Sequence, residues 1–497
     1  MYGHKKIFTF GWVWFSLWSL ICGFCQNTDL IMFSTFRAFQ GIGPALLIPN
    51  AIALIGRTYP VGLKRNLAFA CFGAAGPTGA AVGAVFAALV SQTISWHWCF
   101  WLLSIVCAVL VGVSHFLIPS PEPNPIRRVE SSPQEANSPA NPKSPAESPT
   151  FDWSGAFTGV TGLVLFNFAL NQAPLVGWEE PYIGSLLGLG VIFLCAFVWV
   201  ELYYASQPLI PIRGLQRNAV LALACVFAGW SSHGIWVYYL YIFLEHLRGH
   251  SALLTSAETC PVAITGLFFA FSTVWMLRRI PVAWVMLAAM SFFVLGSLLM
   301  ALAPLEQTYW ANTFVAVVLM PGAMNLSFPA ATILLSSALP KEKQGIAASL
   351  VATMVNYSIS CGLGFAGSIH KYTLLSATAD AGIAGPPPPL SMSNPQLVAV
   401  RLVGLRAAYW FSVALGVMGM CVAALFVLLS RSRGSPSGGT GTDDRPGIQL
   451  VKIKSGEQSP ESTATPMMSS DVLPRPRPAE PAAPDPAYNH HKERPWV

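Results

Sequence analysis

The stretch FRAFQGIGPALLIPNA (residues 36–51) sets an arginine, a glutamine and two prolines inside an otherwise apolar run. A guanidinium within a membrane span costs roughly 2.5–3.5 kcal/mol on insertion scales, so it normally faces a cavity or a partner. One interpretation is that Arg37 pairs with a carboxylate or a substrate and responds to proton occupancy. The alternative is that Arg37 snorkels to the interface, because Asp29 lies only eight residues before it.

The composition of the whole chain is that of a membrane protein. Of its 497 residues, 54% are hydrophobic and 10% are charged, whereas a soluble domain is typically about 25% charged. This balance excludes an ordinary cytosolic enzyme. The net charge of +6 comes from basic residues in short loops, which orient membrane spans. No nucleic-acid partner is therefore expected.

Apolar runs of the length that spans a bilayer, about 20 residues, occur twelve times. They cover residues 7–25, 30–56, 66–91, 97–118, 153–171, 182–204, 219–243, 260–277, 281–303, 309–337, 345–370 and 404–429. Only helices satisfy the backbone in the lipid core, so we expect an all-α polytopic membrane protein. Basic residues gather in alternate loops, which predicts that both termini lie in the cytoplasm.

Two segments are too polar to belong to the membrane body. Residues 119–150 are rich in Pro and Ser and are expected to form a cytoplasmic linker. Residues 432–497 are expected to form a disordered cytoplasmic tail. Neither segment carries a catalytic pattern.

Cysteine, histidine and acidic residues are not grouped at catalytic or metal-ligand spacing. The ten cysteines lie in or beside apolar runs, where cysteine behaves as a small hydrophobe. Cys22 and Cys25 form a C-x-x-C pair without a second pair, so no metal or redox role is assigned to them. The sequence predicts that the protein is not an enzyme and needs no cofactor or metal.

A second stretch, FGAAGPTGAAVGAVFA (residues 72–87), is rich in small residues. Gly76, Gly79 and Gly83 would let another helix approach closely, and Pro77 removes one backbone hydrogen bond and bends the helix. The stretch is interpreted as a hinge and seam between two moving halves, or as a site of simple tight packing.

An internal repeat supports the presence of two halves. Pro49 and Pro60 recur as Pro329 and Pro340, at an offset of 280 residues. Each pair is followed by basic residues and then by a helix rich in small residues. Parallel repeats of this kind are typical of transporters.

These stretches resemble motifs of the major facilitator superfamily. Residues 36–51 are similar to its motif B helix, with Arg37, Gln40 and Gly41 in the matching places. Residues 72–87 resemble its antiporter motif C, carried by Gly76, Pro77, Gly79 and Gly83. The resemblance implies a proton-coupling role for the first set and a role between the moving halves for the second.

Further stretches are similar to the fungal fourteen-span branch of drug:proton antiporters: WHWCFWL (96–102), FDWSGA (151–156) and ELYYASQPLIPIRGLQRN (201–218). Residues 327–364 look most like the subgroup that contains aminotriazole-resistance and low-affinity ammonium transporters. GHKK at residues 3–6 resembles the end of motif A. Fourteen-span members carry two helices before this motif, so the chain is expected to be a truncated form.

The resemblance implies major facilitator-type helix bundles. Residues 1–118 would form an incomplete N-terminal bundle of four spans, residues 151–204 an inserted helix pair, and residues 205–431 a C-terminal bundle of six. Members of this superfamily mostly act as monomers, and a monomer is expected here. The expected location is the plasma membrane, with the vacuolar membrane as the alternative.

Transporter sites lie near the bilayer midplane between the halves. The candidate cavity residues are Asn50, Trp230, His233, Trp236, Tyr239, Asn325 and Asn356. His233 is expected either to titrate near neutral pH or to be a neutral, hydrogen-bonded core histidine. The aromatic residues can stack on aromatic or cationic solutes. Glu258, at the outer mouth of the eighth span, is a further candidate for a proton site.

The leading hypothesis is a secondary active transporter that exports small toxic compounds in exchange for protons by alternating access. Its expected partners are a small-molecule substrate, protons and the lipid bilayer. The alternatives are an ammonium or boric acid uniporter or channel, and an inactive truncated relative.

Overall fold

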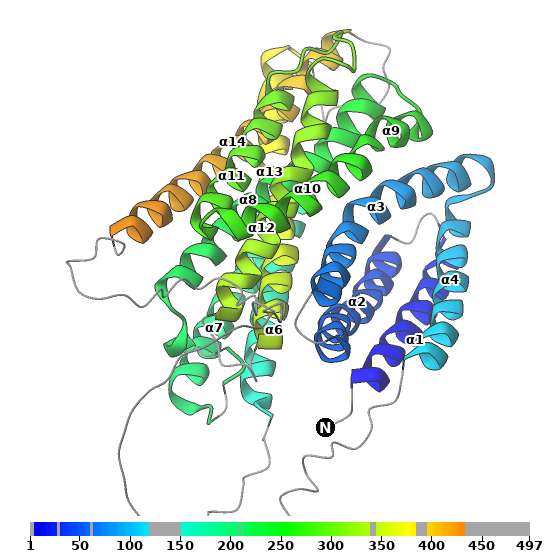
Figure 1. Ribbon diagram of the computed structural model, residues 1–497. Helices are drawn as coiled ribbons and strands as arrows, with labels where there is room; N and C mark the ends of the chain where they lie inside the picture. Colours follow the sequence, from blue (N-terminus) through cyan, green and yellow to red (C-terminus); the bar gives the residue numbers. More distant parts are fainter. Residues whose placement is uncertain are drawn as a thin grey trace, which may run out of the picture. The chain divides into compact units, whose positions relative to one another are not determined.

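The computed structural model of the protein describes residues 4–26, 30–59, 63–118, 151–206, 208–210, 212–337, 344–383 and 395–432. In these ranges all regular structure is helical (Figure 1), so the predicted all-α class is confirmed. The predicted linker (119–150) and the predicted tail from residue 433 onward lie outside the described residues.

The first four helices are α1 (His4–Cys22), α2 (Leu30–Thr58), α3 (Leu63–Thr93) and α4 (Trp96–Leu117). α1 packs along both α2 and α4. The approach of α1 to α2 requires Gly43, because a Cβ at that position would lie 2.6 Å from the Cβ atom of Phe15. α3 differs from the other three helices, since it packs mainly against α9 (Ala252–Thr259) and α10 (Pro261–Arg279).

The next helices are α6 (Trp153–Val176) and α7 (Pro181–Trp199), followed by the π-helix η2 (Val200–Tyr204) and the short 3₁₀ helix η3 (Ile212–Gly214). α6 and α7 pack against each other, and α6 also packs on α13 (Gln344–Asp380). At that contact, Asn167 Oδ1 accepts a hydrogen bond from Ser360 Oγ (2.8 Å), and Asn171 Nδ2 donates to Ser360 Oγ (3.1 Å). Polar side chains thus join two apolar helices.

Four of the later helices pack around α8 (Arg217–Tyr241), which continues as the π-helix η4 (Ile242–Leu247). α8 contacts α11 (Val282–Ala301), α12 (Asn312–Ser337), α13 and α14 (Pro395–Ser432). The hydroxyls of Ser232, Ser297 and Ser412 lie 2.8–3.1 Å from one another and are fully buried. This closed set of hydrogen bonds joins α8, α11 and α14.

Ten helical segments among the described residues are long and apolar enough to cross a membrane. Every one of the twelve predicted spans coincides with a helix, but α1 and α3 are not among the ten, and α3 contributes a shorter apolar stretch, Thr78–Thr93.

The largest differences from the predicted boundaries lie in the last two spans. The predicted span 345–370 continues as helix to Asp380, and the predicted span 404–429 begins at Pro395. The predicted span 260–277 is preceded by the separate helix α9. Proline has no N–H and suits the first turn of a helix, which explains why both α10 and α14 begin at a proline.

Candidate substrate site

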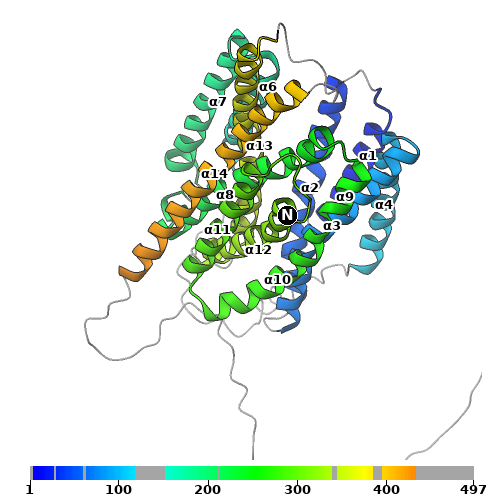
Figure 2. The same ribbon diagram turned by 90° about the horizontal axis from the view of Figure 1, so that it is seen from above.

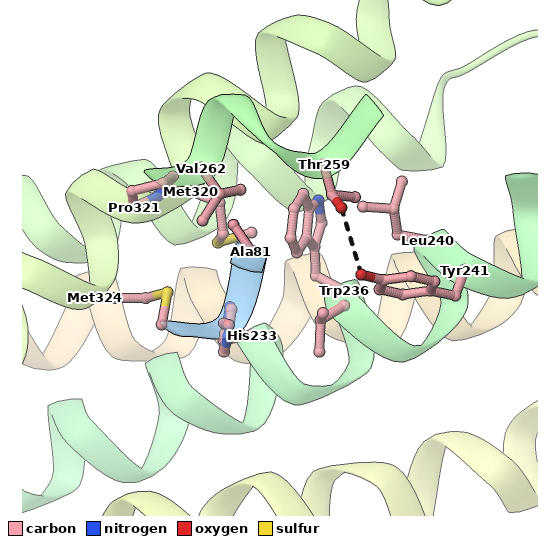
Figure 3. Close-up of a pocket in the computed structure, with 12 residues that line it drawn as sticks. Ala81, His233, Trp236, Leu240, Tyr241, Thr259, Val262, Met320, Pro321 and Met324 are labelled. Atoms are coloured by element: carbon pink, nitrogen blue, oxygen red, sulfur yellow. Dashed lines mark hydrogen bonds between the residues drawn. The ribbon is translucent and has the colours of Figure 1, made fainter. Parts of the chain in front are cut away.

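A cavity of about 100 Å³ lies where α3 meets α8, α12 and the break between α9 and α10 (Figure 3). Its lining comes from α3, before the predicted linker, and from helices that follow the linker. The lining residues are Ala80 and Ala81 of α3, His233, Trp236, Val237, Leu240 and Tyr241 of α8, Thr259 and Val262 at the break, and Met320, Pro321 and Met324 of α12. The cavity therefore lies between α3, one of the first four helices, and the helices α8, α9, α10 and α12.

α8 supplies the largest share of this lining. Its five lining residues recur at intervals of three, one, three and one from His233 to Tyr241, which places them on one face of an α-helix. On α12, Pro321 cannot donate a backbone hydrogen bond. The carbonyl of Pro321 accepts one from Asn325 Nδ2 (2.9 Å).

Two polar atoms in the lining are buried without a hydrogen-bond partner, His233 Nδ1 and Trp236 Nε1. Their residues are only 9% and 3% exposed. The indole N–H is a donor only, whereas an imidazole nitrogen donates or accepts according to the tautomer. A buried polar group left unpaired costs about 1–3 kcal/mol. A bound molecule that offers a hydrogen-bond acceptor to Trp236 would recover this free energy.

Apart from the hydroxyls of Tyr241 and Thr259, the rest of the lining is apolar, and it carries no formal charge. None of its residues is Asp, Glu, Lys or Arg. The rings of His233 and Trp236 stack with centroids 6.1 Å apart. The one hydrogen bond drawn in Figure 3 joins Tyr241 Oη to Thr259 Oγ1 at 3.4 Å. A charged solute would find no counter-charge here, so the lining suits a small neutral molecule with a polar edge.

Of the predicted cavity residues, His233 and Trp236 are brought together in this lining. Three others are buried and hold helices together. Trp230 Nε1 donates to Ser327 Oγ (3.1 Å) on α12, and Tyr239 Oη donates to the carbonyl of Ala366 (3.3 Å) on α13. Asn325 makes the α12 contact described above, and its carbonyl also accepts from Thr273 Oγ1 (3.0 Å) on α10.

The two remaining asparagines do not line the cavity. Asn50 Nδ2 donates to the carbonyl of Leu46 (2.7 Å) within α2. Asn356 is exposed, and its Nδ2 donates to the carbonyl of Ala352 (2.8 Å) within α13.

Arg37 lies on α2, away from this cavity. Its Nη1 donates to Oε1 of Gln40, and Gln40 Nε2 in turn donates to Ser19 Oγ of α1. The guanidinium carbon lies 5.5 Å from the centre of the Phe100 ring on α4. Arg37 thus takes part in a polar connection among α1, α2 and α4. Asp29, its partner in the snorkelling alternative, lies outside the described residues.

The motif glycines do not face a tight contact. An added Cβ would meet no described atom within 4 Å at Gly41, Gly76, Gly79 or Gly83. Three alanines of α3 lie at its contacts with the later helices. Ala80 and Ala81 line the cavity, and the carbonyl of Ala84 accepts from Ser256 Oγ (3.2 Å) on α9. α3 continues through Pro77 as one helix.

Several lining residues could not be identified as cavity residues from the sequence. Met320, Met324 and Val262 are ordinary apolar residues of apolar helices, and nothing in their spacing distinguishes them from a lipid-facing set. Pro261 is a usable signal for Thr259 and Val262, because a proline that starts a new helix marks a break in the span.

A family model of the Major Facilitator Superfamily matches residues 1–365 of the chain. The chain is 43% identical over 426 residues to the low affinity ammonium transporter of Saccharomyces cerevisiae, covering 86% of this chain and 76% of that protein. It is 36% identical to the efflux pump terJ of Aspergillus terreus, with coverage of 86% and 76%. It is 33% identical to the aminotriazole resistance protein of S. cerevisiae, with coverage of 74% and 66%.

Among solved structures, a POT family transporter in complex with a thioalcohol-conjugated peptide aligns with a TM-score of 0.53. The alignment covers 88% of this chain and 83% of that chain at 16% identity, so this likeness concerns the fold alone.

The chain therefore belongs to the major facilitator superfamily and is a membrane transporter rather than an enzyme. Its predicted similarity to the fungal group of aminotriazole-resistance and ammonium transporters is confirmed by the identities above.

Proposed function

We propose that the protein exports small toxic compounds in exchange for protons, by alternating access of two helix bundles. The observation that carries this proposal is the buried pair of unpartnered atoms, His233 Nδ1 and Trp236 Nε1, in a cavity between α3 and the later helices. Such a position can be exposed to either side of a membrane when the two sets of helices rock against each other.

The substrate class follows from the lining. A small neutral solute with a hydrogen-bond acceptor fits apolar walls, an indole donor and an imidazole. The names of two similar proteins, an efflux pump and an aminotriazole resistance protein, support export of such a compound.

A second candidate is uniport of ammonium or boric acid, which the name of the low affinity ammonium transporter favours. The absence of any acidic residue from the twelve lining positions favours a neutral solute over the ammonium cation. A relative without transport activity is the third possibility, and export assays distinguish the three.

The proposed transporter consists of two moving helix bundles and an inserted helix pair. Residues 1–118 and 205–431 form the moving bundles, and residues 151–204 form the inserted pair. The protein acts as a monomer in the plasma membrane, with the vacuolar membrane as the alternative and both termini in the cytoplasm.

Trp236→Phe tests the cavity, because it removes the indole donor and keeps an aromatic ring. The loss of one net hydrogen bond, about 1 kcal/mol, corresponds to a roughly fivefold rise in the KM of export. Efflux of radiolabelled aminotriazole from pump-deficient yeast that expresses the protein gives this value. The matched control is Trp275→Phe on α10, whose side chain is 60% exposed.

We expect the control to behave like the wild type. If Trp236→Phe and Trp275→Phe both leave the KM unchanged, the substrate binds outside this cavity. If no variant, including the wild type, exports the probe, the proposed export function is wrong for this compound class.

A further inference from the structure

The cavity is small for an aromatic solute. Its volume of about 100 Å³ is below the roughly 150 Å³ of an apolar cavity that accommodates benzene. A planar ring smaller than benzene, with small polar substituents, is therefore close to the largest solute that fits without movement of the walls. The residues that determine the position of these walls then determine the size of the solute.

The α12 side of the cavity is formed by Met320, Pro321 and Met324 (Figure 3). A methionine side chain has three rotatable bonds and a soft thioether, so it adapts to its surroundings. Met320 is only 1% exposed, so other residues enclose its side chain. Because protein interiors are close-packed, the empty space available to a displaced Met320 side chain is that of the cavity.

Gly296 of α11 lies directly behind Met320. The helices α11 and α12 pack side by side (Figure 2). A Cβ added at Gly296 would lie 2.7 Å from Cε of Met320 and 3.6 Å from its Sδ, whereas the best separation of two carbon atoms is about 3.5–4.0 Å. The glycine thus leaves room for the methyl group of Met320. Gly296 itself does not line the cavity.

The contact between Gly296 and Met320 is a local one. The third atom close to the added Cβ is the carbonyl oxygen of Ala316, at an ordinary distance of 3.9 Å. The atom in the way is the end of a flexible side chain rather than backbone. Gly296→Ala is therefore expected to move the Met320 methyl by about 1 Å and to leave α11 and α12 in place.

We propose that Met320 sets the upper size of the solute, and that Gly296 positions Met320 from outside the cavity. Gly296 is thus a positioning residue that does not touch the solute. The inference rests on the proposed function, because it narrows the solute class of that site to neutral five-membered rings and excludes their benzo-fused analogues. Met320→Ala admits the larger ring, and Gly296→Ala moves Met320 into the cavity and narrows it.

The reactivity of a reporter cysteine measures the free space in the cavity without any transport. The reporter is Val237→Cys, at a lining position of α8, in a background whose ten native cysteines are replaced by serine or alanine. Methyl methanethiosulfonate and benzyl methanethiosulfonate are neutral thiol reagents of different size. Each modification rate is divided by the rate with free cysteine, and the benzyl-to-methyl ratio reports the size of the group that reaches the cavity.

We expect this ratio to rise several-fold in Met320→Ala and to fall several-fold in Gly296→Ala. The double variant should have the ratio of Met320→Ala alone, because the added methyl group then has nothing to displace. Gly416→Ala is the matched control. It fills a buried glycine of α14 against Val294 of α11, neither of which lines the cavity, and should keep the wild-type ratio.

An unchanged ratio in Met320→Ala overturns the size limit. A fall in Gly296→Ala that persists in the double variant shows that Gly296 acts through another contact, and overturns its positioning role. If Gly296→Ala does not fold, the double variant decides. Recovery of folding when the Met320 side chain is removed supports the contact, whereas failure of both variants overturns it.

Export measures the consequence for selectivity. Wild-type protein in pump-deficient yeast should export radiolabelled aminotriazole but not a benzo-fused aminotriazole, and Met320→Ala should export both. Export of both compounds by the wild type overturns the size limit.

The inference and the proposed function can fail separately. Reactivity ratios that change as expected, with no export of either compound by any variant, overturn the proposed function and support the assignment of the cavity wall. Export of aminotriazole with ratios that respond to neither substitution overturns the inference alone.

Discussion

At the scale of single residues, Gly41 and Gly43 stand two positions apart on α2 and have different reasons to be glycine. A Cβ at Gly43 would come within 3.1 Å of the Cα atom of Phe15, whereas a Cβ at Gly41 would meet no atom of the described residues within 4 Å. Both glycines lie in the stretch 36–51, and the resemblance to motif B singles out only Gly41. Gly43 faces α1 and is required for close packing, whereas Gly41 does not face α1, and this difference depends on where α1 lies.

Gly43→Ala is therefore expected to destabilise the contact between α1 and α2. Overpacking of a close contact typically costs about 1–3 kcal/mol, which should lower the midpoint of thermal unfolding in detergent. Gly41→Ala is the matched control and should leave the midpoint unchanged. Equal midpoints for both variants would mean that α1 and α2 do not approach each other as closely as described.

Arg37 is the residue for which the sequence is most informative, because a guanidinium in a span requires a partner. The structure gives that partner as Gln40. The resemblance to motif B supports a proton-coupling role, so Arg37→Ala should abolish proton-driven export. Arg279→Ala, which changes an exposed arginine at the end of α10, should not.

Vesicles with an imposed pH gradient measure this effect directly. Normal proton-coupled export by Arg37→Ala would remove the role assigned to that residue.

At the scale of helices, α6 and α13 are joined along their length. Besides the Asn167–Ser360 and Asn171–Ser360 bonds, Trp178 Nε1, two residues after the end of α6, donates to Ser368 Oγ of α13 (3.1 Å). These contacts indicate that the inserted pair moves together with α13. The contact of α3 with α9, in contrast, joins the two proposed moving bundles, and under the proposed alternating access these two helices would separate.

Two crosslinks should therefore have opposite effects on export. Joining Asn167→Cys to Ser360→Cys with a short thiol reagent should leave aminotriazole efflux near its uncrosslinked rate. Joining Ala84→Cys to Ser256→Cys should reduce efflux to less than about a tenth, since one state is then trapped. Inhibition by the first crosslink would show that α6 moves relative to α13.

At the scale of the whole molecule, the cavity belongs to no single helix. Its lining comes from α3 and from helices more than 140 residues later in the chain. A protonophore is expected to stop export by the full protein, because alternating access without a gradient has no net direction. Export that continues at the same rate after addition of the protonophore would favour the uniporter alternative.

The membrane class, the helical content and the positions of the spans could be predicted from the sequence, because the lipid core admits only long apolar helices in such a chain. His233 and Trp236 could be proposed as cavity residues for a similar reason, since polar and aromatic groups in a span are uncommon enough to be noticed. Trp230, Tyr239 and Asn325 gave the same signal, yet the side chains of Trp230 and Tyr239 donate to other helices and the Asn325 amide donates within α12.

Only the tertiary structure decided which polar groups are already paired and which face the cavity. It also placed Glu258 next to His250 and Gly296 against Met320, contacts that apolar periodicity does not reveal. The physical reason is that the hydrophobicity of a segment predicts only whether it lies in water or in lipid. Hydrogen-bond partners come from other helices, and their identity depends on how those helices pack.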